Sequence, residues 1–73
     1  MNFEKMLLVY DEAIKLQGDR ELSDFDISML LQESEANVGV RLANTEMIPL
    51  ITMVAKGRAE PQKYRERLSN PPE

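Results

Sequence analysis

The chain has 73 residues, a length that suits a single domain. Thirteen residues are acidic and nine are basic, so its net charge is −4. It contains no histidine and no cysteine, which excludes zinc fingers, disulfide scaffolds, thiol catalysis and histidine-based acid–base chemistry. The acidic balance also disfavours nucleic-acid binding, because a phosphate-binding surface needs an excess of positive charge.

Apolar stretches in this chain are short. The run Met6–Val9 is followed by Asp11 and Glu12, so we expect no signal peptide. The longest apolar stretch, residues 47–55, has about half the length that a membrane-spanning helix needs. The absence of cysteine fits a reducing compartment. We therefore expect a soluble cytoplasmic protein that does not associate with membranes.

A first helix is predicted from Asn2, which can act as its N-cap, to about Gln17. Its apolar side chains recur every three or four residues and define one face: Phe3, Met6, Leu7, Tyr10, Ala13 and Ile14. Gly18 follows at the position where helices commonly end in a left-handed residue. Lys15 in the last turn is favourable to the helix dipole.

A second helix is predicted by the capping box at residues 23–26, Ser-Asp-Phe-Asp, with aspartate in place of the usual glutamate. Leu22 and Ile27 flank the box at the spacing of a hydrophobic staple. We expect this helix to end at Gln32 or Glu33.

A third helix is predicted from Glu35 to about Ala43, with Ser34 as its cap. Gly39 inside it would cost about 1 kcal/mol relative to alanine. A short strand over residues 38–42 is the alternative, because these residues alternate in polarity. Helix is preferred because no other segment is predicted to pair with such a strand.

A fourth helix is predicted from Asn44 or Thr45 to Lys56, and Gly57 is expected to end it as a left-handed residue. Pro49 favours a later start, at residue 48 or 49, because proline is tolerated only near the first turn. This segment is the most apolar of the chain, so we expect its helix to be central.

The composition changes after Gly57. We therefore divide the chain into a helical domain, residues 1–57, and a basic tail with several prolines, residues 58–73. Pro61 can begin a short helix over residues 62–68, and this tail is expected to be either a docked helix or partly disordered.

Charge is divided unevenly along the chain. Residues 1–55 carry ten acids and four bases, whereas residues 56–73 carry five bases and three acids. A basic tail can reach an acidic partner surface, fold back onto the acidic body or remain solvated. Because they fit a core pattern poorly, we expect four tail residues to contribute to partner contact: Lys63, Tyr64, Arg65 and Arg67.

Residues 27–42 also follow the spacing of a helix-turn-helix motif. Its inward positions are apolar: Ile27, Leu31, Val38 and Leu42. The turn glycine is missing, however, and Arg41 is the single base of the second helix. A helix-turn-helix DNA-binding repressor is therefore an alternative function that the negative charge disfavours, and a plain helical hairpin explains the same spacing.

The remaining polar residues do not form a recognisable catalytic or metal motif. Acids alternate between Asp19 and Asp26 as in a calcium loop, but the glycine and the terminal glutamate of an EF-hand are missing. No serine has a histidine to activate it, so we expect no catalysis, cofactor or metal.

Four methionines fill gaps in the core or form an adaptable partner groove: Met6, Met29, Met47 and Met53.

The whole chain, from Met1-Asn2-Phe3-Glu4-Lys5 to Asn70-Pro71-Pro72-Glu73, resembles the small phage-encoded transcription regulators that bind host RNA polymerase. It is similar in size, acidic balance and overall character to an antiterminator and initiation inhibitor of a Xanthomonas phage. The resemblance implies binding to the polymerase β′ subunit near its N-terminus, displacement of the sigma factor and read-through of terminators. No binding motif of the family matches residue by residue, so the resemblance assigns no site.

Together these patterns predict an all-α bundle of three to four helices, with a helix-turn-helix-like pair and a partly disordered C-terminal tail. The predicted function is non-catalytic binding of bacterial RNA polymerase by a monomer in the host cytoplasm. Inhibition of a bacterial defence nuclease is a further alternative.

Overall fold

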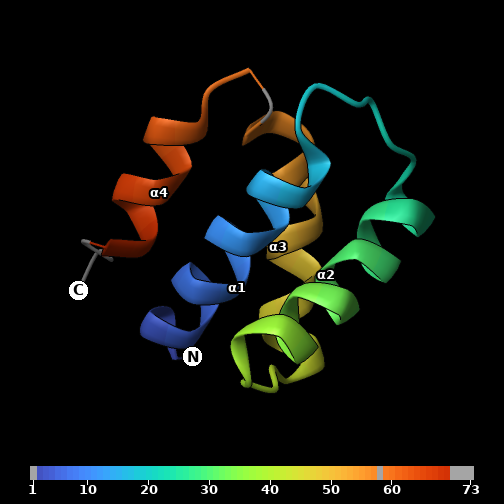
Figure 1. The fold of residues 1–73 in the computed structure, drawn as a ribbon. Helices are drawn as coiled ribbons and strands as arrows, with labels where there is room; N and C mark the ends of the chain where they lie inside the picture. The colour runs from blue at the N-terminus through green and yellow to red at the C-terminus, as the bar shows by residue number, and fades with distance from the viewer. Residues whose placement is uncertain (1, 58, 70–73) are drawn as a thin grey trace.

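The structure, a computed structural model, describes residues 2–57 and 59–69, which form four α-helices (Figure 1). These are α1 (Phe3–Gln17), α2 (Asp24–Val38), α3 (Asn44–Gly57) and α4 (Pro61–Ser69). No strand occurs in the described residues, and the predicted all-α bundle is confirmed. α2 and α4 lie on opposite sides of α1 and α3, and within the described ranges they do not contact each other.

One continuous core holds the bundle together. Every helix and the loop before α3 contribute buried apolar side chains to it: Met6, Val9, Tyr10, Ala13, Ile27, Leu30, Leu31, Leu42, Leu50, Val54, Tyr64 and Leu68. Burial of each large aliphatic side chain contributes about 1.5–3 kcal/mol, so a chain of this length needs most of them to remain folded.

α1 has the predicted limits. The Asn2 side chain accepts a hydrogen bond from the Lys5 N–H at 3.1 Å. Gly18 ends the helix with a φ of 59° and a ψ of −130°, so its φ is positive but it does not adopt the expected left-handed helical conformation. Arg20 then folds back, and its guanidinium donates to the carbonyls of Leu16 at 2.8 Å and Gln17 at 3.1 Å. The positive charge of Arg20 therefore lies at the negative end of the α1 dipole.

α2 begins as predicted but does not end where we expected. Ser23 Oγ accepts the Asp26 N–H at 3.2 Å, which confirms the cap. The helix then continues to Val38, so the predicted break near residues 32–34 is wrong. Ser34 is fully buried inside α2, and its hydroxyl donates to the Leu30 carbonyl at 2.8 Å instead of capping a new helix.

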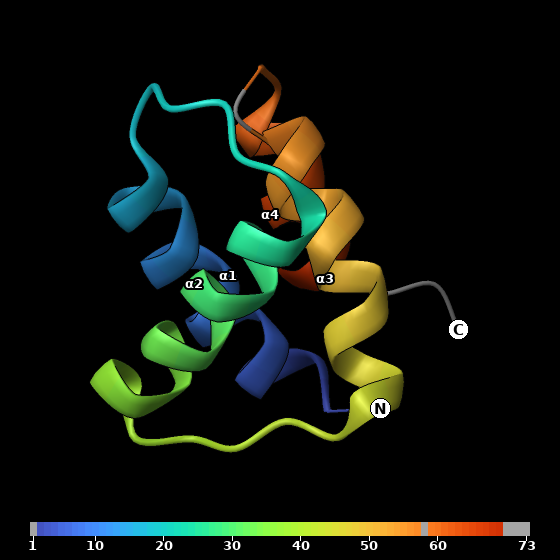
Figure 2. The same ribbon diagram turned by 90° about the vertical axis from the view of Figure 1, so that its right-hand side faces the viewer.

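Gly39 marks the true end of α2. It adopts the left-handed conformation, with φ 74° and ψ 28°, and its N–H donates to the Glu35 carbonyl at 2.9 Å. Residues 40–43 form a loop to α3, so the predicted third helix over residues 35–43 is wrong, and so is the helix-turn-helix-like pair that depended on it. The loops on the two sides of α2 lie at opposite ends of the bundle (Figure 2).

α3 begins earlier than Pro49 led us to expect. The Ala43 carbonyl accepts the N–H groups of Glu46 at 2.9 Å and of Met47 at 3.0 Å. Glu46 Oε1 accepts the Ala43 N–H at 2.9 Å, as the third residue of a capping box does. Pro49 therefore lies inside the helix, where its missing N–H removes the usual donor to the Thr45 carbonyl.

α4 is a helix docked on α1 and α3, which was one of the two alternatives for the tail. Its apolar side chains, Tyr64 and Leu68, are buried in the same core as α1. Partial disorder was the other alternative for the tail, residues 58–73, of which residues 58 and 70–73 lie outside the described residues.

Gly57 joins α3 to this last helix by close packing and not by a left-handed turn. It is the buried last residue of α3, and its φ is not positive. A Cβ at this position would overlap the Tyr10 hydroxyl and lie 3.0 Å from Ile14 Cδ1. The Tyr10 hydroxyl also donates to the Pro61 carbonyl at 3.5 Å. The missing side chain of Gly57 thus lets Tyr10 reach the beginning of α4.

Candidate protein-binding surface

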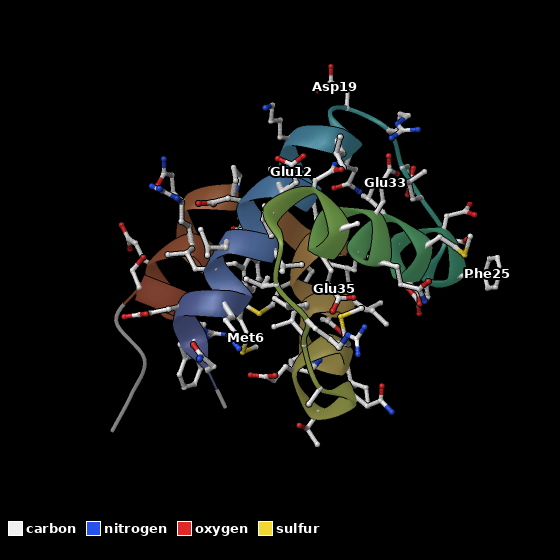
Figure 3. The ribbon with its side chains drawn as sticks, turned by 60° about the horizontal axis from the view of Figure 1, so that its bottom comes forward. Met6, Glu12, Asp19, Phe25, Glu33 and Glu35 are labelled. Atoms are coloured by element: carbon white, nitrogen blue, oxygen red, sulfur yellow. The ribbon has the colours of Figure 1, made fainter. Side chains whose placement is uncertain are left out.

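The outward face of α2 carries apolar side chains that the core does not use. Phe25 is 72% exposed and Met29, one helical turn later, is 54% exposed. Gln32 and Ala36 continue the same line and are also exposed. Figure 3 shows the Phe25 ring pointing away from the bundle at the N-terminal end of α2. We call these four residues the outer seam of α2.

Helical geometry places the outer seam opposite the core. Ile27, Leu30, Leu31 and Ser34 of α2 are buried. With 3.6 residues per turn, residues 25, 29, 32 and 36 fall on the reverse side of the helix from these four. Exposed residues scattered singly need no explanation, but a phenylalanine and a methionine one turn apart form a joint apolar surface.

Two open hollows flank the outer seam. One, of about 690 Å³, lies between the loop before α2 and the helix, and its lining includes Leu22, Met29 and Glu33. The other, of about 460 Å³, lies between the end of α2 and the beginning of α3, and its lining includes Ala36 and Met47. Gln32 contributes to both hollows.

The surroundings of the outer seam are strongly acidic. Residues 19–38 carry six acids and one base, and α2 itself carries four acids and no base. The one base, Arg20, has its guanidinium on the carbonyls at the end of α1. Within the described residues, none of the six acids forms a salt bridge. Arg41 of the next loop also lines the hollow beside Ala36, so the acids on this side of the molecule outnumber the bases and are only partly offset by them.

Some of these carboxylates have a structural role. Asp24 and Asp26 lie in the first turn of α2, where negative charge stabilises the helix dipole. Glu35 Oε2 accepts the Leu42 N–H at 2.6 Å and so fastens the loop after α2. Glu33 is exposed and has neither role, which makes it the acid of α2 most available to a partner.

The four tail residues predicted to contact a partner are not a free cluster. Tyr64 is 6% exposed and belongs to the core, so the premise that it fits a core poorly is wrong. Arg65 Nε lies 3.1 Å from Asp11 Oδ1, and Lys63 Nζ lies 3.6 Å from Glu60 Oε2.

The cations of Lys63 and Arg67 lie near the Tyr64 ring. Lys63 Nζ is 5.7 Å and Arg67 Cζ is 5.8 Å from the ring centroid. The structure therefore brings Lys63, Tyr64 and Arg67 together on α4, with the ring buried against α1 and α3. Their contact with a partner stays a prediction.

The methionines divide between the two roles considered for them. Met6 is buried, and Met47 and Met53 are half-buried against the core. Met29 alone of these four is more than half exposed. Phe25 and Met29 were not predicted as a pair, although their offset from the apolar face of residues 27, 30 and 31 was a usable signal.

Two further groups have shifted pKa values that report structural contacts. Backbone N–H groups of Ala43 and Asn2 donate to Glu46 and hold the pKa of its carboxyl below the usual value. Burial, together with Asp11 and Tyr64, raises the pKa of Tyr10 to about 12. Both groups fasten helices to one another, and neither lies on the outer seam.

Comparison with protein-family models, curated proteins and solved structures yields no match for this chain. Within the described residues, no group of three or more acidic side chains is arranged to hold a metal ion. No helix of this part of the chain has the length and apolar character needed to cross a bilayer. The candidate site is therefore defined by the surface of α2 alone.

Proposed function

We propose that this chain is a non-catalytic regulator that acts by binding another protein, and that its target is bacterial RNA polymerase. The observation that carries the protein-binding part is the exposure of Phe25 and Met29, at 72% and 54%, on one turn of α2. Aromatic residues and methionine are enriched in protein interfaces, where a few well-buried side chains contribute most of the binding energy.

The acidic setting narrows the class of partner. Residues 19–38 carry six acids against one base, so this side of the molecule attracts basic surfaces and repels nucleic acid. The choice of polymerase comes from the resemblance to phage regulators in size and acidic balance. It implies action in the host cytoplasm through the β′ subunit, with displacement of the sigma factor and antitermination.

The fold does not support the alternative function of a helix-turn-helix repressor. α2 is one continuous helix over Asp24–Val38, so the two helices of that motif do not exist in the fold. This helix also has no lysine or arginine to contact phosphates.

Retention of purified polymerase by the immobilised chain tests the proposal. We expect core polymerase to be retained and promoter-dependent initiation to fall as the chain is added. An unrelated acidic protein of similar size controls for non-specific attraction. Absence of retention at both low and physiological salt would refute the polymerase target, and a shift of duplex DNA at physiological salt would favour the repressor instead.

A further inference from the structure

We infer that the outer seam of α2 is the docking face of this protein, and that its occupant is a basic amphipathic helix of the partner. The inference rests on the proposed protein-binding function and names the site and the chemistry of the bound segment. Three features of α2 support it: the spacing of the seam, the charges beside it and the hollows on its two sides.

The spacing of the outer seam is that of a helix-packing surface. Phe25, Met29, Gln32 and Ala36 follow one another at intervals of four, three and four residues. This alternation is the heptad spacing by which one helix packs along another. All four residues are uncharged and exposed. A 15-residue helix is about 22 Å long, which is enough to hold several turns of a partner helix.

The charges beside the seam indicate the sign of the partner. In the heptad register set by the seam, Asp26 and Glu33 occupy the flanking positions on one side, and Glu35 occupies one on the other. Flanking positions in helix pairs are those that meet the charges of the partner. Because all three are acidic, a partner helix with lysine or arginine at its own flanking positions is favoured, and an acidic one is repelled.

The hollows give room for the partner's apolar side chains. Packed helices place the side chains of one into the grooves beside the ridge of the other. Hollows of about 690 and 460 Å³ lie on the two sides of the outer seam and share Gln32 as a lining residue. Their linings include the apolar side chains of Leu22 and Met47, so leucine-sized side chains on the partner helix can be buried there.

A second copy of this chain is a poorer occupant. Two α2 helices packed through their outer seams would bring acidic flanking positions together, because α2 has no base to pair with them. The basic helix of this chain, α4, already buries its own apolar residues, Tyr64 and Leu68, in the bundle. A membrane is also disfavoured, because anionic lipids repel an acidic surface.

The direct test uses a synthetic amphipathic helix of leucine and lysine as the probe, titrated into the full chain and followed by amide NMR shifts. A peptide of the same composition in scrambled order, which has no apolar face, is the control. We expect the largest shifts within residues 22–36 and about tenfold weaker binding of the scrambled peptide. Equal binding of the two peptides, or shifts centred on α4, would overturn the inference.

Matched variants test the seam itself. The double variant Phe25→Ser with Met29→Ser should weaken binding of the amphipathic probe about tenfold. Leu8→Ser on α1 and Ile48→Ser on α3 remove side chains that are 51% and 67% exposed outside the seam, and they should leave affinity within about twofold. An equal effect of all three variants would contradict a specific face.

Charge is tested separately from apolar contact. Glu33→Lys should lower the affinity for the amphipathic probe and reduce the salt dependence of its binding. Glu66→Lys on α4 should change neither quantity. Equal effects of the two reversals would mean that net charge alone drives binding and would overturn the inference.

The same double variant separates this inference from the polymerase proposal. If the wild type retains polymerase and the variant Phe25→Ser with Met29→Ser does not, the polymerase target and the docking face are both supported. If polymerase is retained equally by both, the docking face is wrong while the target stands. If the probe shifts amide signals of α2 but polymerase is never retained, the docking face is supported and the polymerase target is wrong. Concentration-dependent dimerisation that the double variant abolishes would identify a second copy as the occupant and overturn the inference.

Discussion

α2 and α4 pack on opposite sides of the α1–α3 pair, yet they use their side chains in opposite ways. α4 is basic and buries its sizeable apolar residues, and Arg65 pairs with Asp11 of α1. α2 is acidic and presents Phe25 and Met29 to solvent in addition to those that it buries. Charge alone therefore does not distinguish the proposed docking face of this protein. The distinguishing feature is apolar surface beyond what the core requires.

The largest expected effect comes from the buried side of α2. Leu31 is fully buried, so Leu31→Ala should lower the free energy of unfolding by about 3 kcal/mol through lost burial and a cavity. Urea denaturation followed by circular dichroism measures this. The matched control is Leu8→Ala, which removes a half-exposed leucine and should change stability by less than about 1 kcal/mol. A similar loss in both variants would mean that burial does not distinguish the two positions.

The next effect concerns the attachment of α4. Gly57→Ala should destabilise the protein by about 1–3 kcal/mol, because the new methyl group overlaps the Tyr10 hydroxyl. An alanine usually stabilises a helix relative to glycine, so the sign is the informative quantity. Combining Gly57→Ala with Tyr10→Phe removes one of the two groups in conflict and should recover part of the loss. A stabilised single variant would show that α4 does not depend on this close approach.

Alkaline pH should weaken the same junction. The pKa of Tyr10 is raised from 10.0 to about 12 in the fold, so the folded state keeps a proton that the unfolded chain releases. The stabilising contribution is complete below pH 10 and is lost as pH rises through 12, by about 3 kcal/mol. Stability measured from about pH 9 to about pH 12 should therefore fall more steeply in the wild type than in Tyr10→Phe. Parallel curves would exclude Tyr10 as the titrating group.

The smallest effect is expected at the exposed ion pair of α4. Arg65→Gln removes its contact with Asp11 and should cost about 0.5 kcal/mol, since exposed pairs contribute little. A double-mutant cycle with Asp11→Asn isolates the pair from other effects. A coupling energy above about 2 kcal/mol would show that charge, and not Tyr64 and Leu68, fastens α4 to the bundle.

The sequence was sufficient to predict the helical class, the limits of α1 and the cap of α2, because each has a local signal. It was not sufficient for the end of α2. A serine at position 34 is equally compatible with capping a new helix and with donating its hydroxyl to the Leu30 carbonyl one turn earlier. Gly39 likewise fits a helix interior at some cost or a left-handed end. Tertiary packing decides between these alternatives.

The candidate site was harder still to predict. Phe25 lies inside a capping box, a pattern that accounts for the neighbouring aspartates and carries no information about the aromatic ring. Tyr64 was expected at a partner surface because its helix has few apolar residues, but the missing side chain of Gly57 and the position of Tyr10 let α4 dock. Packing between residues this far apart in the sequence cannot be predicted from a local sequence pattern.

Glu46 gives this small fold a defined response to acid. Its carboxylate accepts N–H groups from Asn2 at 2.6 Å and Ala43 at 2.9 Å, at the beginnings of two helices that are distant in sequence. Because these donors lower its pKa below 4.5, the contribution is present at neutral pH and disappears as pH falls through the lowered value. Acidification should therefore loosen the attachment of the first turn of α1 to the beginning of α3.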